Sequence, residues 1–178
     1  MRLKDKVCVI TGAAQGIGEA CAMRFANERA KVVVSDVQIE KGEAVAKAIR
    51  NAGGEAIFFA CDVSQKSDCV DLIQAAVDAF GSVDVHLSNA AIIAAKEFLD
   101  ITEEDWEQTV GVNLNGFFYA GKLPLHKWSN KASVISSICP RSMRLSQFLR
   151  QRHTRFVREV FSSSRNQWHF HWRRMAFV

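Results

Sequence analysis

The fold of this chain is decided by residues 11–18, which read Thr11-Gly12-Ala13-Ala14-Gln15-Gly16-Ile17-Gly18. This stretch follows an apolar, β-rich run at residues 6–11 and precedes a helical pattern at residues 19–27, so it forms the turn between a strand and a helix. Glycine permits a tight turn, lets backbone N–H groups approach a phosphate, and allows the helix to pack on its strand. Because the helix N-terminus adds partial positive charge, the turn is suited to a dinucleotide pyrophosphate.

Asp36 strengthens this interpretation, because a glycine-rich turn alone can also be purely structural. The acid stands at the end of the second expected strand, about 20 residues after the turn, where a carboxylate hydrogen-bonds the hydroxyls of an adenosine ribose. An acid there would repel a ribose 2′-phosphate, and no arginine follows directly in residues 36–39. The sequence therefore predicts NAD, in preference to NADP, as the cofactor.

Strand-like and helix-like patterns alternate along the first two thirds of the chain. We expect strands at residues 6–11, 31–35, 56–60 and 83–87, and helices at residues 19–27, 39–51, 66–80 and 102–118. This order predicts an α/β fold with a Rossmann-like, doubly wound parallel sheet and right-handed crossovers. We expect the sheet to be incomplete after the fourth strand and the following helix. The fourth strand would then be an apolar edge, which favours aggregation.

Composition divides the chain into two parts. The 178 residues carry a net charge of +4, but residues 1–122 hold 12 basic and 18 acidic side chains, whereas residues 123–178 hold 11 basic side chains and one acid, Glu159. All ten glycines lie within residues 1–121, and three of the four tryptophans come later. We therefore predict a dinucleotide-binding domain at residues 1–122 and a basic segment at residues 123–178 that is not native to that fold.

The cysteines and the N-terminus indicate where the protein works. The five cysteines have no Cys-x-x-Cys spacing, and most lie in apolar runs, so we expect buried, reduced thiols and neither disulfides nor zinc ligands. The first apolar run, residues 7–10, is far too short for a signal peptide or a membrane span. These features predict a cytoplasmic protein without membrane contact.

Residues 11–18 resemble the Thr-Gly-x-x-x-Gly-x-Gly cofactor motif of the short-chain dehydrogenase/reductase family. Two further matches follow in order: residues 62–63 resemble the family's adenine-contacting Asp-Val pair, and residues 89–90 resemble the centre of its Asn-Asn-Ala-Gly motif. Carried over residue by residue, the resemblance implies cofactor contacts from Gly12, Gln15, Gly16, Ile17, Gly18, Asp36, Asp62, Val63, Asn89 and Ala90.

The last of these motifs is imperfect, because Ser88 and Ala91 replace its outer asparagine and glycine. Asn113 is similar to the family's active-site asparagine, which shapes a helix and supports a proton-relay water; without the resemblance it would be a surface helical amide. The resemblance covers about residues 5–122. It implies an NAD-dependent oxidoreductase that acts on a secondary alcohol or ketone, and a homo-oligomer for the intact parent protein.

The family's catalytic Ser, Tyr and Lys have no counterparts here. The tyrosine is the general acid/base and is followed by lysine in a Tyr-x-x-x-Lys spacing. Tyr119 is the only tyrosine in the sequence, and Lys122 follows it at the wrong interval, so we interpret Tyr119 as a packing residue. Ser136-Ser137 ends a strand-like run, but no tyrosine follows. We expect a catalytically inactive chain; the alternative is a non-catalytic NAD-binding remnant or sensor.

A change of reading frame explains why the match stops. Reading each codon from its third base after about residue 121 forces alanine across Trp168-His169 and glycine across Met175-Ala176. The same frame permits tyrosine across His153-Thr154 and lysine across Val157-Arg158, four codons later, which is the family's spacing. We therefore interpret the tail as the product of truncation or of a one-nucleotide frame change near residues 121–125.

A genuine basic C-terminus is the main rival to the frame change. Its arginines and aromatic side chains have a composition suited to nucleic acid. No recognition motif accompanies them, and a poorly packed extension explains them equally well, so we do not expect nucleic acid binding. His169 and His171 stand without further ligands, and we predict no metal site.

Overall fold

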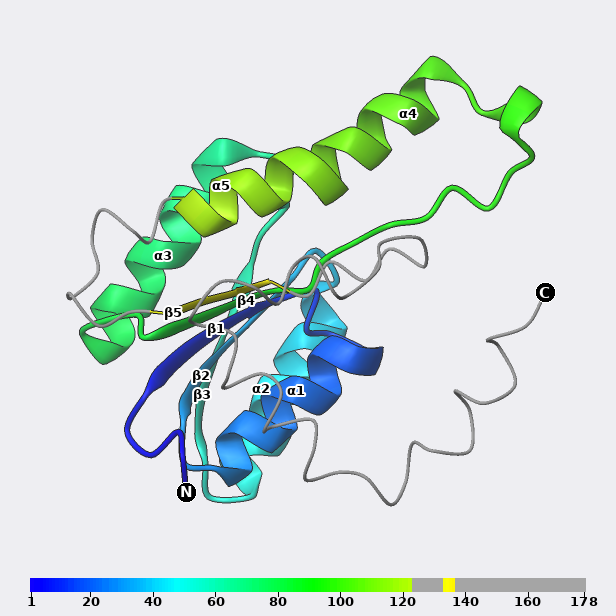
Figure 1. The fold of residues 1–178 in the computed structure, drawn as a ribbon. Coiled ribbons are helices and arrows are strands. Elements are labelled where there is room, and N and C mark those ends of the chain that lie inside the picture. The colour runs from blue at the N-terminus through cyan, green and yellow to red at the C-terminus, as the bar shows by residue number, and fades with distance from the viewer. Residues whose placement is uncertain (123–132, 137–178) are drawn as a thin grey trace. The chain divides into compact units, whose positions relative to one another are not determined.

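A parallel sheet forms the centre of the computed structural model, which describes residues 1–122 and 133–136 (Figure 1). Its strands are β1 (Val7–Thr11), β2 (Lys31–Asp36), β3 (Glu55–Ala60), β4 (Val85–Ser88) and β5 (Ser133–Ser136). They lie in the order β3-β2-β1-β4-β5, and every neighbouring pair is parallel. The α/β fold and the Rossmann-like, doubly wound sheet predicted from the sequence are confirmed.

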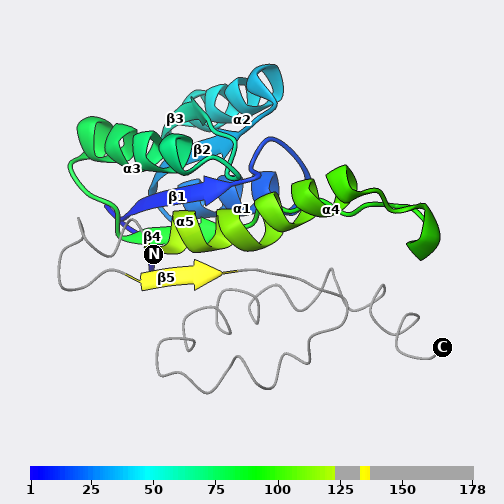
Figure 2. The ribbon, with the colours of Figure 1, turned by 90° about the horizontal axis from the view of Figure 1, so that it is seen from above.

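Helices cover both faces of the sheet. They are α1 (Gly16–Asn27), α2 (Ile39–Asn51), α3 (Lys66–Phe80), α4 (Glu103–Val110) and α5 (Gly116–Lys122). Figure 1 shows α1 and α2 on one face and α3 and α5 on the other, while Figure 2 shows α4 lying beyond the carboxyl ends of the strands. Because both faces are covered, the central strands are buried throughout: all five residues of β1 are buried, as are five of the six in β2.

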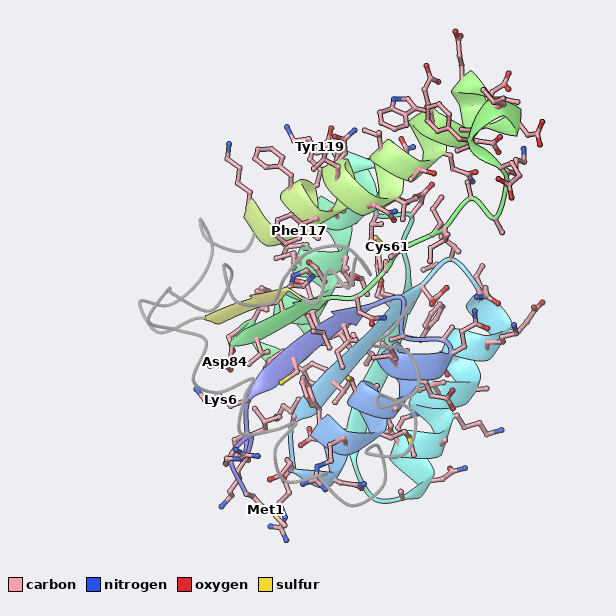
Figure 3. All side chains as sticks on the ribbon, turned by 45° about the vertical axis from the view of Figure 1, so that its right-hand side comes forward. Met1, Lys6, Cys61, Asp84, Phe117 and Tyr119 are labelled. Atoms are coloured by element: carbon pink, nitrogen blue, oxygen red, sulfur yellow. The ribbon has the colours of Figure 1, made fainter. Side chains whose placement is uncertain are left out.

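The strand order reverses between β1 and β4, which are neighbours in the sheet. The chain builds outward from β1 to β2 and β3, then returns to the other side of β1 to form β4. Lys6 and Asp84 lie side by side where these two strands begin, with 2.7 Å between Nζ and Oδ1 (Figure 3). In sheets of this kind, ligands bind at the opposite, carboxyl ends of the strands beside such a reversal.

The sheet extends one strand further than the sequence predicts. Backbone pairing joins β4 to β5 from Val85↔Ser133 to Ser88↔Ser136. The prediction that β4 is an apolar edge is therefore wrong, and β3 and β5 are the outer strands of the described sheet. The physical reason is that strand pairing uses main-chain groups, which any sequence carries, and Val134 and Ile135 have the β-branched side chains that favour strands.

The helix boundaries agree with those predicted from the sequence, except for α1 and for the helix expected at residues 102–118. The first helix begins at Gly16, so the last three residues of the glycine stretch form its first turn. The expected helix at residues 102–118 begins with a capping box, in which Thr102 Oγ1 accepts from Asp105 N at 3.2 Å and Asp105 Oδ2 accepts from Thr102 N at 3.0 Å. It is then interrupted by a π-helical segment, Gly111–Asn115, before continuing as α5.

Three further expectations concern the described part of the chain. Cys8, Cys61 and Cys69 are free and buried, Cys21 is free and partly exposed, and Cys139 lies outside the described residues; burial raises the pKa of the Cys8 thiol to about 12. None of the helices described is long and apolar enough to cross a membrane. No group of three or more metal-binding side chains is found among the described residues, while His169 and His171 lie outside them.

Candidate cofactor site

Most of the predicted cofactor residues gather at the carboxyl ends of β1, β2 and β4, and Asp62 and Val63 follow β3. The glycine stretch follows β1, Asp36 is the last residue of β2, and Asn89 follows β4 directly. Because β1 lies between the other two strands, residues more than 70 positions apart in the sequence meet there. The site therefore occupies the reversal of strand order described above.

Two glycines allow the loop after β1 to pack against its surroundings. Gly12 has a φ of +64°, and a Cβ on it would lie 2.7 Å from Ala90 Cα. A Cβ on Gly18 would lie 2.1 Å from the carbonyl oxygen of Gly12. Neither position accepts a larger residue without moving backbone atoms, so both glycines shape the site by close packing.

Asn89 joins the loops after β4 and β1 by hydrogen bonds. Its side-chain Nδ2 donates to the carbonyl oxygens of Thr11 at 3.1 Å and Gly12 at 2.9 Å. The main-chain amides of Asn89 and Ala90 donate in turn to Thr11 Oγ1, at 3.2 and 3.3 Å. The intact centre of the imperfect motif thus makes these contacts, while Ser88 Oγ lies 3.3 Å from His86 Nδ1 on the same strand.

The rim of the glycine loop is open. Gly16 has a φ of +60°, and a Cβ placed on it would meet no atom of the described residues within 4 Å. Gln15 and Ile17 on either side are exposed, and Gln15, the residue that caps α1, makes no side-chain capping hydrogen bond. First-turn amides that no side chain caps are suited to an anion, because they carry the positive end of the helix dipole.

Asp36 is buried, with only 8% of its surface exposed, and its carboxylate is hydrogen-bonded to two main-chain amides. Oδ2 accepts from Ala14 N at 2.9 Å and Oδ1 accepts from Gln38 N at 3.0 Å. The acid therefore joins the glycine loop to the turn between β2 and α2. The sequence predicts a ribose contact for Asp36 but does not reveal these bonds within the protein.

Asp62 and Val63 lie in the loop after β3, against the helix that follows the π-helical segment. Asp62 Oδ1 accepts from Ser64 N at 2.9 Å, which fixes the loop locally. Val63 is 6% exposed, and a Cβ on Gly116 of α5 would lie 2.7 Å from its Cγ2. The start of α5 therefore contacts this loop directly.

Asn113 lies in the π-helical segment and is half-buried. Its Oδ1 accepts from Ile92 N at 2.9 Å, and its Nδ2 donates to Ile92 O at 2.8 Å. Both functions of the amide are thus used to hold the segment that follows β4, so the side chain is not a free surface amide. Single π turns inside α-helices are frequent at functional sites.

Tyr119 and Lys122 of α5 each lie beside the ring of Phe118. Tyr119 is half-buried on α5 (Figure 3). It packs against the core cluster that includes Val9, and its ring centre lies 6.0 Å from that of Phe118. Lys122 Nζ lies 5.0 Å from the centre of the Phe118 ring. The interpretation of Tyr119 as a packing residue is confirmed. Ser136 lies in β5, whereas Ser137 is outside the described residues.

Lys41 is at the site although sequence reasoning did not select it. From the first turn of α2, its Nζ donates to Gln38 Oε1 at 2.7 Å and to Gln15 Oε1 at 3.3 Å. The first contact follows from the i, i+3 spacing on a helix, which the sequence displays. The second joins α2 to the rim of the glycine loop and depends on how the two elements pack.

Comparison with known proteins agrees with this geometry. The family model described as short chain dehydrogenase matches residues 6–139. An uncharacterized oxidoreductase of Thermotoga maritima is 37% identical over 135 residues, which cover 76% of this chain and 53% of that protein. A 2,5-dichloro-2,5-cyclohexadiene-1,4-diol dehydrogenase of Sphingobium indicum is 39% identical over 137 residues, which cover 76% and 55%.

Solved structures give the same result. A short-chain dehydrogenase/reductase variant from Serratia marcescens superimposes with a TM-score of 0.72 at 26% identity, covering 76% of this chain and 56% of that one. A short chain dehydrogenase from Mycobacterium avium gives a TM-score of 0.72 at 29% identity, with 75% and 54% covered. The chain spans about half the length of the curated relatives it matches.

Proposed function

Because the chain belongs to the short-chain dehydrogenase family, we propose that residues 1–122 are the NAD-binding half of an oxidoreductase acting on a secondary alcohol or ketone. One observation supports the proposal above the others. The exposed loop at Gly16, which has open space beside it, stands next to a strand that ends in Asp36. An anion site and a ribose acceptor are thereby adjacent, as a dinucleotide requires.

Each part of the cofactor has residues suited to it. The amides of Gly16 and Ile17 would bind the pyrophosphate at the start of α1, Asp36 would accept from the adenosine ribose, and residues 62–63 would contact adenine. Residues 89–90, across the reversal of strand order, would contact the nicotinamide half. Bound NAD supplies the carbon that accepts or donates a hydride. The open loop and the buried acid fit such a ligand.

We further propose that this chain binds the cofactor without turning over substrate. Catalysis of hydride transfer to or from an alcohol oxygen needs a group that moves the proton of that oxygen. Tyr119 is packed against the core, and the sequence has no Tyr-x-x-x-Lys spacing. Asn113 would hold the segment after β4 in position, through its two bonds to Ile92. The alternative role, a non-catalytic NAD sensor, has the same binding site.

Calorimetric titration of the full chain with NAD tests the proposal. Gly16→Asp would place a negative charge at the proposed pyrophosphate site and should abolish measurable binding. Gly16→Asn is the matched control, because both residues tolerate the left-handed conformation and only aspartate adds charge. A folded wild-type chain that does not bind NAD, or two variants with equal affinity, would contradict the proposal.

A second experiment tests the loss of turnover and its cause. Incubation with NAD and a panel of secondary alcohols should produce no NADH, whereas steady cofactor reduction would contradict inactivity. Sequencing the encoding DNA from the Gly111 codon past the stop should reveal Ser, Tyr and Lys codons in a shifted frame. An unbroken frame without them would make the basic tail genuine. The codons concerned belong to residues outside the described part of the chain.

The proposal also covers the cellular location and the oligomeric state. We propose a cytoplasmic location, supported by the buried, unpaired thiols of Cys8, Cys61 and Cys69. We also propose that the basic segment after residue 139, where the family match ends, is foreign to the fold of the residues before it, and that the intact parent protein forms a homo-oligomer. Light scattering of a chain with the restored frame should give the mass of a dimer or larger assembly; a monomer would contradict this.

A further inference from the structure

Lys41 connects the two loops that border Asp36. Its Nζ lies 2.7 Å from Gln38 Oε1 in the turn after β2, and 3.3 Å from Gln15 Oε1 in the glycine loop. The main-chain amide of the same Gln38 donates to Asp36 Oδ1 at 3.0 Å. Gln38 thus bonds both to the Lys41 ammonium and to the Asp36 carboxylate, which we expect to bind the adenosine ribose.

The charge of Lys41 is not matched by a carboxylate in direct contact. Both of its hydrogen-bond partners are neutral amides, and no salt bridge joins Lys41 to another of the described residues. The acids nearest to it in α2 are otherwise placed: Glu43 pairs with Arg50, and Glu40 is the adjacent residue, which does not face it on a helix. The ammonium is therefore available to an anionic ligand.

The charge of Asp36, in contrast, is partly compensated. Each of its oxygens already accepts a hydrogen bond from a main-chain amide, one from Ala14 and one from Gln38. Such bonds stabilise a carboxylate and reduce the negative potential that it presents outward. Asp36 therefore repels a ribose 2′-phosphate less strongly than the sequence predicts.

We propose that Lys41 sets the selectivity of this site between the two nicotinamide dinucleotides, by supplying the counter-charge for a ribose 2′-phosphate. The chain then binds NADP as well as NAD, with a preference for NAD smaller than about tenfold. This inference rests on the proposed function, since it concerns the same site. Lysine is suited to the task because its ammonium is a mobile point charge on a flexible stem, able to leave two neutral amides for a phosphate.

The experiment compares ligands that differ only in the 2′-phosphate. Affinities of the full chain for NAD, NADP, 5′-AMP and adenosine 2′,5′-bisphosphate are measured by calorimetry for wild type, Lys41→Ala and Lys41→Arg. Lys47→Ala is the matched control, because Lys47 is an exposed lysine on the same helix. The adenosine ligands test this end of the site without requiring the nicotinamide end.

Lys41→Ala should weaken NADP and the bisphosphate by about tenfold and change NAD and 5′-AMP by less than about twofold. Lys41→Arg should retain most of the NADP affinity, Lys47→Ala should change nothing, and the effect of Lys41→Ala should shrink at high salt. An equal loss for all four ligands would assign Lys41 to loop positioning or to the pyrophosphate and overturn the inference. So would an unchanged ratio of NADP to NAD affinity.

The two proposals fail in different ways. If wild type binds NAD and 5′-AMP but the selectivity is independent of Lys41, only the inference is overturned. If a folded wild-type chain binds none of the four ligands, the proposed function fails and the inference fails with it.

Discussion

The two sides of the strand-order reversal are built by different means. From β1 to α3, each element follows from its own sequence pattern and packs on the elements that precede and follow it. From β4 to α5, the chain is held largely by bonds to distant residues, as Asn89 is to Thr11 and Gly12. The comparison teaches that local sequence determines the shape of the part from β1 to α3. The part from β4 to α5 is positioned by its hydrogen bonds to the first part.

The largest expected effect comes from Gly18, which packs against both Gly12 and Asn89. Gly18→Ala would set a Cβ 2.1 Å from the carbonyl of Gly12 and 2.6 Å from Asn89 Nδ2. We expect about 3 kcal/mol of destabilisation, or no folded protein, because backbone atoms must move. Gly16→Ala is the comparison, since Gly16 has a positive φ, which Gly18 lacks, but no described atom within 4 Å of an added Cβ, and it should cost about 1 kcal/mol. Urea denaturation measures both, and equal effects would refute the packing role.

The second effect depends on pH and concerns His86 of β4. The imidazole is fully buried, its Nε2 has no hydrogen-bond partner among the described residues, and burial lowers the pKa from 6.5 to about 4. The unfolded chain binds this proton more readily than the folded chain does. Protonation of His86 therefore does not affect stability above pH 6.5, and it destabilises the fold as pH falls from 6.5 toward 4. We expect a loss of about 2 to 3 kcal/mol over that window.

Comparison with His86→Leu isolates this contribution from the carboxylates that titrate in the same range. The free energy of unfolding of the variant should fall by less than that of wild type between pH 7 and pH 4.5. Parallel curves for the two proteins would show that the histidine does not stay neutral in the fold.

The third effect concerns the hydrogen bonds by which Asn89 joins the two sides of the strand-order reversal. Asn89→Ala removes two hydrogen bonds to main-chain carbonyls, and we expect it to reduce the free energy of unfolding by about 2 kcal/mol. Asn89→Asp should cost at least as much, because a carboxylate cannot donate to the carbonyls of Thr11 and Gly12. The exposed Asn115 serves as the control, and Asn115→Ala should change stability by less than about 0.5 kcal/mol. If Asn89→Ala does not change the free energy of unfolding, the loops after β1 and β4 stay together without these hydrogen bonds.

The smallest effect is local and lies at the start of α4. Thr102→Ala removes the side-chain acceptor of the capping box and should cost about 1 kcal/mol. Thr102→Ser retains the hydroxyl and should restore most of the loss. If thermal denaturation shows equal losses for both variants, the capping bond is not what stabilises the helix.

Much of the fold can be read from the sequence because its signals are local. The helices at residues 39–51 and 66–80 are predicted to the residue, since apolar spacing and a glycine turn mark each one. The capping box at Thr102 is likewise visible as a pattern of neighbouring residues. The interruption at Gly111–Asn115 is not visible, because those residues continue a helical pattern and only contacts with other elements select the π turn.

The candidate site divides in the same way. The sequence by itself determined the glycine stretch, the acid at the end of β2 and the alternation of strands and helices, because turn chemistry and periodicity act over a few residues. Only the tertiary structure decided that both oxygens of Asp36 are bonded to the main chain, that Lys41 reaches Gln15, and that β5 pairs with β4. Those contacts join residues far apart in the chain, and their geometry depends on how whole elements pack.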